Sequence, residues 1–311
     1  MVAFLCLAPL LPLPAELASL CAPIALLSGA TLSLTLDNPY PLQSKVWSKW
    51  LLQGSVVLLG FSMDILKVAQ AGRAGLVFSL ISITAIFTLG WLAQKCLRIQ
   101  PITGLLVSTG TAICGGSAIA AVSSVVDARE EEVSVAVGTV FLLNALALLA
   151  FPPLGHLFGL TQKQFGTWAG IAIHDIASVV GAGTSYGAQS LDEATAVKLS
   201  RVLYLVPVTF IAAWFHHRTE QGIVGRKKVQ VPWFVGLFLL ACVAHSFIPA
   251  LAPFTVEIKR VAAAGFSVAL FLVGTALTRK TIRSVGIRPL AMGLILWVFI
   301  SVTALVLVQR S

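Results

Sequence analysis

Two stretches of the chain place glycine, hydroxyl and ionisable side chains inside long apolar runs. The first, GTAICGGSAIAAVSSVV over residues 110–126, holds Gly115 and Gly116 in tandem between Cys114 and Ser117. Each glycine in a helix costs about 1 kcal/mol relative to alanine, so the pair predicts a break in the helix. A helix broken within a membrane leaves N–H groups and a positive dipole end that can hold an anion or a coupling ion. The alternative is that these small residues only let two helices pack closely.

The second stretch, GIAIHDIASVVGAGTSYG over residues 170–187, places His174 beside Asp175, with Ser178 shortly after them. We expect His174 and Ser178 to share a helix face, because residues four apart do so. Ionisable side chains within a membrane are costly and are therefore functional candidates. A neighbouring histidine and aspartate can hold a proton near neutral pH, which makes them candidates for ion coupling. Alternatively, both only hydrogen-bond to neighbouring helices.

Two other polar side chains interrupt apolar runs. Asn144 either reaches the same site or ties two helices together. Arg201 pairs with an acid, meets an anion through two parallel hydrogen bonds, or extends to the membrane interface. The five cysteines and the histidines show no zinc-ligand spacing, and no phosphate-binding loop is present. The sequence therefore predicts no metal site, no cofactor, no ATP-driven pump and no catalytic nucleophile.

The composition places these stretches in a membrane. The 311 residues are 58% hydrophobic and only 11% charged, with a mean hydropathy of +0.94. Soluble domains carry about 25% charged residues, and a membrane β-barrel would show short alternating segments instead of long apolar runs. We therefore predict an all-α polytopic membrane protein. The formal net charge of +9 falls mostly in loops, where it sets orientation, and does not indicate binding to nucleic acid.

The apolar runs predict about eleven transmembrane helices and no separate soluble domain, so residues 1–311 form a single membrane domain. The expected spans are 2–20, 22–36, 47–66, 74–94, 103–126, 133–155, 164–187, 194–215, 231–250, 258–278 and 287–308. Lys and Arg number 13 on the amino-terminal side and 8 on the other, where Lys198 and Arg201 are counted, which predicts a cytoplasmic amino terminus. Similar stretches around Gly60 and Gly274, 214 residues apart, predict an inverted repeat unless the similarity arose by chance.

Three strings together resemble a family of conserved hypothetical bacterial membrane proteins labelled as sulfate exporters. They are STGTAICGGSAIAAVSSVV followed by VAVGTVFLLN, GIAIHDIASVVGAG followed by KLSRVLYLVPV, and VGTALTRKTIRSVGIRPLAMGLIL near the carboxy terminus. The likeness extends from about Pro23 to the end of the chain. In that family the second motif usually reads His-Glu, with Gln three residues after the acid. This chain departs from the pattern, because it has Asp175 and Ser178 there.

The resemblance implies a carrier with inverted repeats, related in fold to sodium/proton antiporters and bile-acid symporters. In such carriers two discontinuous helices cross within a core that moves against a panel of helices. The residues that match the family's glycine-rich motif are Cys114, Gly115, Gly116 and Ser117, and those that match its His-acid motif are His174 and Asp175.

Together, the residues and the resemblance predict a secondary transporter, not an enzyme, that exports a small inorganic or organic anion across the bacterial inner membrane. Sulfate or a related sulfur-containing anion is the expected substrate. The predicted anion ligands are Thr111, Cys114, Gly115, Gly116, Ser117, Asn144 and Ser178. His174 and Asp175 are expected to couple transport to H⁺ or Na⁺.

Three alternatives stay open. The first is a Na⁺/H⁺ antiporter-like cation exporter of the same architecture, with Asp175 as the ion ligand. The second is a channel or a membrane enzyme that transports nothing, and a turnover rate above that of a conformational cycle would indicate a channel. The third concerns assembly: related architectures are often dimers, so the predicted partners include a second copy of the chain.

Overall fold

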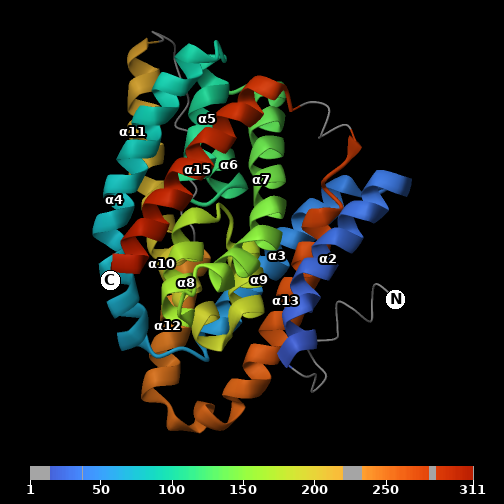
Figure 1. Cartoon of the computed structure of the whole chain (residues 1–311), viewed down its shortest axis with the longest axis vertical. Coiled ribbons are helices and arrows are strands. Elements are labelled where there is room, and N and C mark those ends of the chain that lie inside the picture. Colours follow the sequence, from blue (N-terminus) through green and yellow to red (C-terminus); the bar gives the residue numbers. More distant parts are fainter. Residues whose placement is uncertain (1–14, 37, 220–232, 280–284, 311) are drawn as a thin grey trace.

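All regular elements in the part of the chain that the structure describes are helices, as predicted (Figure 1). This computed structural model describes residues 15–36, 38–219, 233–279 and 285–310. The elements are α2 (Ala15–Leu36), α3 (Pro41–Gly60), α4 (Ile65–Cys96), α5 (Pro101–Ala112), α6 (Gly116–Ser123), α7 (Glu130–Leu157), α8 (Gln162–Ala172), α9 (Ile176–Tyr186), α10 (Ala188–Val202), α11 (Leu205–Thr219), α12 (Trp233–Phe247), the 3₁₀ helix η2 (Pro249–Phe254), α13 (Thr255–Gly274) and α15 (Ile287–Arg310). Most of the expected span 2–20 lies outside the described residues.

Ordinary capping interactions fix several helix starts. The Asp64 carboxylate accepts hydrogen bonds from the backbone N–H groups of Leu66 and Lys67 at the start of α4. Thr161 and Gln164 exchange side-chain and backbone hydrogen bonds at the start of α8, which is a capping box. Proline occupies the first turn of α3 and α5, where its missing N–H is not needed. Local sequence therefore sets where these helices begin.

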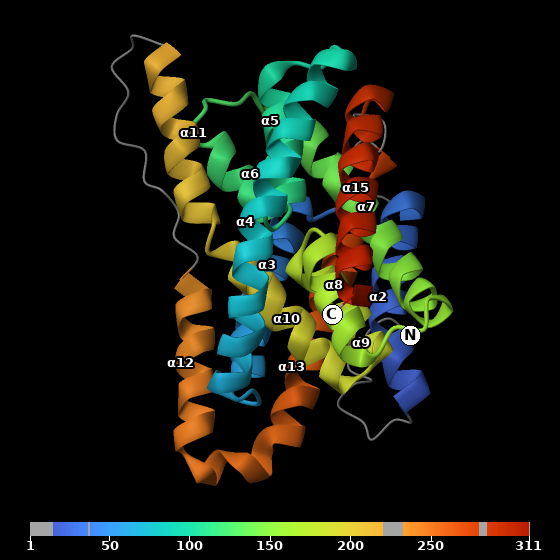
Figure 2. The same cartoon turned by 60° about the vertical axis from the view of Figure 1, so that its left-hand side comes forward.

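In the part of the chain that the structure describes, fewer helices are long and apolar enough to cross a membrane alone than the eleven predicted spans. Four stretches of the described chain are long and apolar enough to cross a membrane alone: Phe78–Cys96, Glu130–Leu157, Ala188–Trp214 and Ile287–Arg310. A fifth forms if α12 is taken together with η2 and α13, which Figure 2 shows as a hairpin and which are bent by 109°.

Two of the predicted spans are each interrupted near the middle. Residues 103–126 contain most of α5 and all of α6, and residues 164–187 contain most of α8 and all of α9. A helix of twelve residues, such as α5, rises only about 18 Å, whereas the hydrocarbon core of a bilayer is about 30 Å thick. Each of these spans can therefore cross a membrane only as a broken pair.

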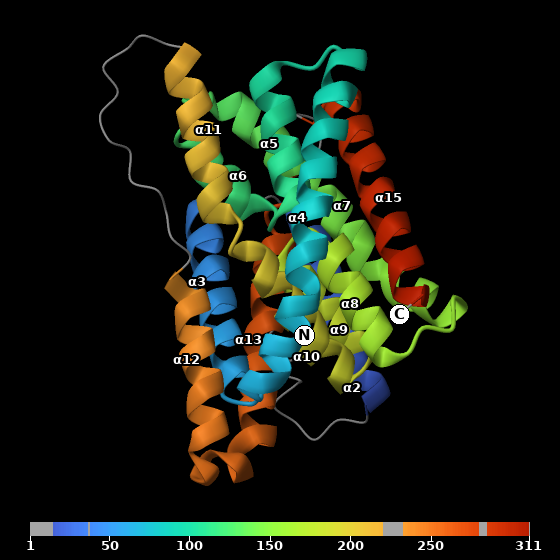
Figure 3. The same cartoon turned by 90° about the vertical axis from the view of Figure 1, so that its left-hand side faces the viewer.

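The described helices pack in two groups, which Figures 1 and 3 show from two sides. The first group contains α2, α3, α12 and α13, and the second contains α4 to α11 with α15. Within the first group α13 lies against α2 and α3. Glycine permits this approach, because a Cβ at Gly29 would collide with the carbonyl of Phe271. Contact between the groups runs mainly from α9 to α2 and α13, and from α12 to α4.

Two pairs of helices end at positions that are separated by the same number of residues. α3 and α13 each contain 20 residues, and their last residues, Gly60 and Gly274, are 214 residues apart. α4 and α15 end at Cys96 and Arg310, which have the same separation. α3 and α13 also pack against each other. These bounds coincide with the spacing of the predicted repeat, and its inverted orientation stays a prediction.

Candidate functional site

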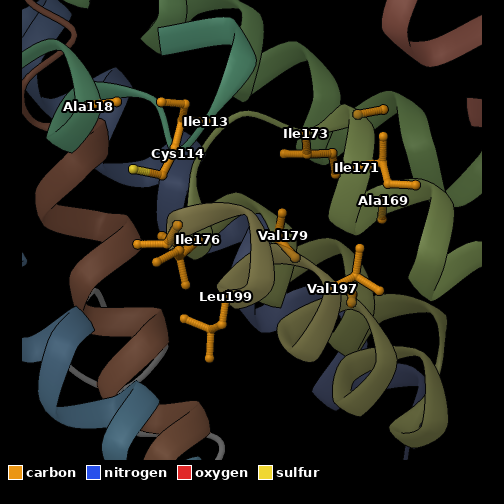
Figure 4. Packing of buried hydrophobic residues seen from close by; sticks show 14 of the residues in the cluster. Ile113, Cys114, Ala118, Ala169, Ile171, Ile173, Ile176, Val179, Val197 and Leu199 are labelled. Atoms are coloured by element: carbon orange, nitrogen blue, oxygen red, sulfur yellow. The ribbon is translucent and has the colours of Figure 1, made fainter. Parts of the chain in front are cut away.

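The break between α5 and α6 lies against the break between α8 and α9. Gly115 lies in the first break with φ +66° and ψ −131°, a conformation that other residues rarely adopt. A Cβ at Gly115 would lie 3.3 Å from the Cβ of Asp175 in the second break. Figure 4 shows Cys114 beside Ile176, among the apolar side chains around the two breaks. The predicted break at the glycine pair is confirmed, and it meets the predicted His-Asp pair.

The start of α6 offers unpaired backbone donors. Gly116 and Ser117 are its first two residues, and their N–H groups have no acceptor within the helix. These groups also form the positive end of the helix dipole. Gly116 is half-buried and Ser117 is exposed, so this helix end can be reached from the protein surface. The Ser117 hydroxyl lies 3.1 Å from the Cys114 thiol.

The second break is held by a side chain on α7 and by one of the break's own side chains. The Asn144 side-chain oxygen, on α7, accepts hydrogen bonds from the backbone N–H groups of His174 at 3.1 Å and Asp175 at 3.3 Å. The Asp175 carboxylate caps α9 and accepts the N–H of Ser178 at 3.0 Å. Asn144 therefore ties two helices together at the candidate site. The expectation that His174 and Ser178 share a helix face is wrong, because the helix is interrupted between them.

Arg201 is fully buried at the first break. Its side chain is 0% exposed and donates through Nη1 to the hydroxyl of Ser82 at 3.0 Å. Its Nη2 donates to the carbonyl of Ala112, the last residue of α5, so the guanidinium compensates the negative end of that helix dipole. The alternative that Arg201 extends to the membrane interface is wrong. Both terminal nitrogens bind protein atoms, so two parallel bonds to a ligand would require a rearrangement.

Lys198 is a second buried cation on α10, 1% exposed, within electrostatic range of Asp175, Cys114 and Arg201. Among the described residues, neither Lys198 nor Arg201 has a carboxylate within 4.0 Å. Lys198 is not one of the predicted site residues, because the orientation count places it on one side of the membrane with the charges that set topology. The available signal was its place in KLSRVLYLVPV, three residues before Arg201, which puts both cations on neighbouring positions of one helix.

Several other buried polar atoms near the breaks have no hydrogen-bond partner among the described residues. They are the Thr111 hydroxyl, the Asn144 side-chain nitrogen, both ring nitrogens of His174 and Nε of Arg201. An unpaired buried donor or acceptor costs about 1–3 kcal/mol, so a ligand that pairs with such groups recovers this energy. Donors and cations outnumber the single carboxylate of Asp175. The arrangement therefore suits a small anion better than a cation.

The structure brings most of the predicted site residues together. Cys114 and Gly115 lie in one break, with Gly116 directly after it at the start of α6. Asn144, His174, Asp175 and Ser178 surround the other break. Thr111 is buried in the last turn of α5. Ser117 is unlike the other predicted site residues, because it is exposed at the protein surface at the start of α6.

Comparison with known proteins finds one matching family model, described as conserved hypothetical protein 698, over residues 15–293. A UPF0324 membrane protein of Porphyromonas gingivalis is 45% identical over 288 residues, which cover 91% of this chain and 85% of the relative. A UPF0324 membrane protein of Bacteroides thetaiotaomicron is 42% identical over 285 residues, with 91% and 84% covered. No solved structure matches the chain. These relatives and the apolar helices agree with the prediction of a multi-pass membrane protein.

Proposed function

Because the chain belongs to the family of membrane proteins described as conserved hypothetical protein 698, we propose that it is a secondary transporter for a small anion. One observation carries this proposal. Two buried cations, Lys198 and Arg201, lie where two interrupted helices meet, and Asp175 is the one described carboxylate within electrostatic range of Lys198. The bacterial inner membrane is the proposed location.

The charge balance of the site supports an anion as the cargo. Moving a charged group out of water costs several kcal/mol unless an opposite charge compensates it. With all three groups ionised, Lys198, Arg201 and Asp175 leave one positive charge uncompensated. An anion removes this surplus, whereas Na⁺ would increase it. The cation exporter alternative is therefore less well supported than the anion carrier.

The backbone and neutral side chains supply the remaining ligands. The first N–H groups of α6 point their dipoles toward the break, as anion sites at helix N-termini require. The Lys198 ammonium and the unpaired donors of Thr111 and Asn144 add hydrogen bonds. Three or four donors around a tetrahedral oxyanion are the arrangement that sulfate needs. Sulfate or a related sulfur-containing anion is accordingly the first candidate.

The two helix groups provide a basis for alternating access. We assign α2, α3, α12 and α13 to a panel, and the second group to a core that moves against it. The ion pair between Lys259 on α13 and Asp192 on α10, at 3.0 Å, links panel to core. It borders a polar crevice of about 630 Å³ between the ends of α4, α8, α10 and α12. Movement of the core would have to break this ion pair.

Cross-linking the two groups is expected to stop transport. In a functional variant without native cysteines, Asp192→Cys and Lys259→Cys would be joined by a short bifunctional methanethiosulfonate. Transport should fall to background and return on reduction, because the core can no longer move against the panel. The matched control is Glu257→Cys with Arg260→Cys, an ion pair within α13 that the same reagent can bridge harmlessly. Undiminished transport by the fully cross-linked pair would exclude this movement.

The proposed function is tested with purified protein in liposomes. Labelled sulfate is loaded inside, and its efflux is measured with and without an imposed pH gradient. The proposal predicts protein-dependent efflux that the gradient accelerates. If sulfate and other sulfur oxyanions do not move under any gradient while Na⁺ does, the anion carrier is wrong and the cation exporter takes its place.

A further inference from the structure

We infer that a divalent anion binding beside Lys198 drives the uptake of one proton by the Asp175 carboxylate, whereas a monovalent anion binds without a proton. The inference rests on the proposed function, and it assigns a stoichiometry and a proton-binding atom to the same site. It follows from the charges around the two breaks and from the contact between them.

Before an anion binds, two contacts favour the ionised form of Asp175 and oppose the cost of its burial. Its carboxylate accepts the N–H of Ser178 at 3.0 Å and lies at the positive end of the α9 dipole. Lys198 is the cation that acts on it. In its ionised form the carboxylate compensates the charge of Lys198. The charge of Arg201 then remains uncompensated.

No second carboxylate near the site can take over this role in the described part of the chain. Besides Lys198, the thiol of Cys114 lies in electrostatic range of Asp175, and His174 is its neighbour in the chain. The helices packed against α9 carry further charged or titratable groups, none of which hydrogen-bonds to the Asp175 carboxylate among the described residues: Cys21 on α2, Glu130, Glu131, Glu132 and His156 on α7, Lys163 on α8, Asp192, Glu193 and Arg201 on α10, and Glu257, Lys259 and Arg260 on α13.

An anion at the start of α6 lies close to Asp175, because the two breaks are in contact through Gly115. A like charge at such a distance disfavours the ionised carboxylate, and the anion also competes with it for Lys198. Repulsion from a divalent anion is twice that from a monovalent one. Ionised Lys198, Arg201 and Asp175 sum to one positive charge, which a monovalent anion neutralises. A divalent anion leaves one negative charge in excess, and protonation of Asp175 removes it.

His174 is a less suitable proton acceptor, although it belongs to the predicted coupling pair. Its ring is 1% exposed and lies within electrostatic range of both Lys198 and Arg201. A proton on the ring would add a third positive charge beside two cations, which those charges oppose. Asp175, in contrast, becomes neutral when it takes up a proton, so its protonation adds no third positive charge. The geometry therefore divides the pair, with the proton on Asp175 and a neutral His174.

The test measures proton uptake when sulfate binds to the purified protein. Sulfate is titrated calorimetrically in buffers of different ionisation enthalpy, which gives both the binding constant and the protons taken up per anion. Linkage predicts about one proton per sulfate and about none per nitrate. Asp175→Asn should bind sulfate with no proton uptake, and His174→Gln should retain the uptake. Asparagine is also a good N-cap residue, so α9 is expected to stay folded in the first variant.

Three results would overturn the inference. Sulfate binding to the wild-type protein without proton uptake contradicts the linkage but leaves the anion site in place. Uptake that persists in Asp175→Asn and disappears in His174→Gln assigns the proton to the histidine. Absence of binding by both sulfate and nitrate would instead remove the proposed function, and the linkage with it.

Discussion

Replacing Lys198 by methionine is expected to lower anion transport at least about 100-fold, which corresponds to roughly 2.7 kcal/mol of lost anion stabilisation. The ammonium is the one buried cation near the breaks whose donors are not hydrogen-bonded to described protein atoms, so it can turn to a ligand. Methionine keeps the unbranched shape, and removing a buried charge that has no ion-pair partner does not destabilise the fold. Sulfate efflux from liposomes and the unfolding temperature are measured together.

The control for Lys198→Met is Lys49→Met, an equivalent change at an exposed position of α3. This variant should transport like the wild type, since solvent and salt screen an exposed charge. Transport by Lys198→Met within a few-fold of the wild type would show that the ammonium does not hold the anion. Loss of both transport and folding would show that Lys198 is structural.

Gly115→Ala is expected to abolish transport and to lower the free energy of unfolding by about 1–3 kcal/mol, the usual cost of a strained backbone conformation. The residue has φ +66° and ψ −131°, and the new Cβ would lie 3.3 Å from that of Asp175. The first break would have to change its backbone or move away from the second. Either change displaces the start of α6 from the anion. Thermal unfolding and efflux measurements report the two effects separately.

Two other glycines provide controls for this prediction. Gly54→Ala, in α3, meets nothing within 4 Å and is expected to leave transport unchanged. At Gly116 the new Cβ would lie 3.2 Å from the ring of Phe141, which can shift slightly, and no positive φ is required there. Gly116→Ala should therefore retain most of the activity. Equal activity of the Gly115 and Gly116 variants would contradict the role assigned to the first break.

The all-helical fold and the first break could be predicted because their signals are local. Long apolar runs predict buried helices, and α7 and α15 begin and end within three residues of the predicted spans. Paired glycines weaken a helix wherever it lies, so the interruption next to Gly115 follows from the sequence. The polar residues beside it were candidate ligands for the same local reason.

The second break could not be predicted from its own residues. No glycine or proline lies between Ile173 and Ile176, and the apolar run suggests a continuous helix. The interruption depends on Asn144, which lies about thirty residues earlier in the chain and accepts the two backbone N–H groups there. A hydrogen bond between distant helices leaves no mark in a hydropathy pattern.

The burial of Lys198 and Arg201 could not be predicted for a related reason. Counting charges by loop assumes that a cation near the end of an apolar run lies at the membrane surface. Arg201 is instead held by Ser82 on α4 and by the last carbonyl of α5. Those partners come from other parts of the chain. Removing the two cations from the count of 8 also increases the predicted bias toward a cytoplasmic amino terminus.

Direct localisation of an anion tests whether an anion binds where the two interrupted helices meet. Crystals of the protein would be soaked in selenate, which shares the tetrahedral shape and charge of sulfate and scatters anomalously. We expect a selenium peak between the Lys198 ammonium and the first residues of α6, and its loss in crystals of Lys198→Met. If selenate competes with sulfate for transport but gives no peak at this position, the anion site lies elsewhere and the account is wrong.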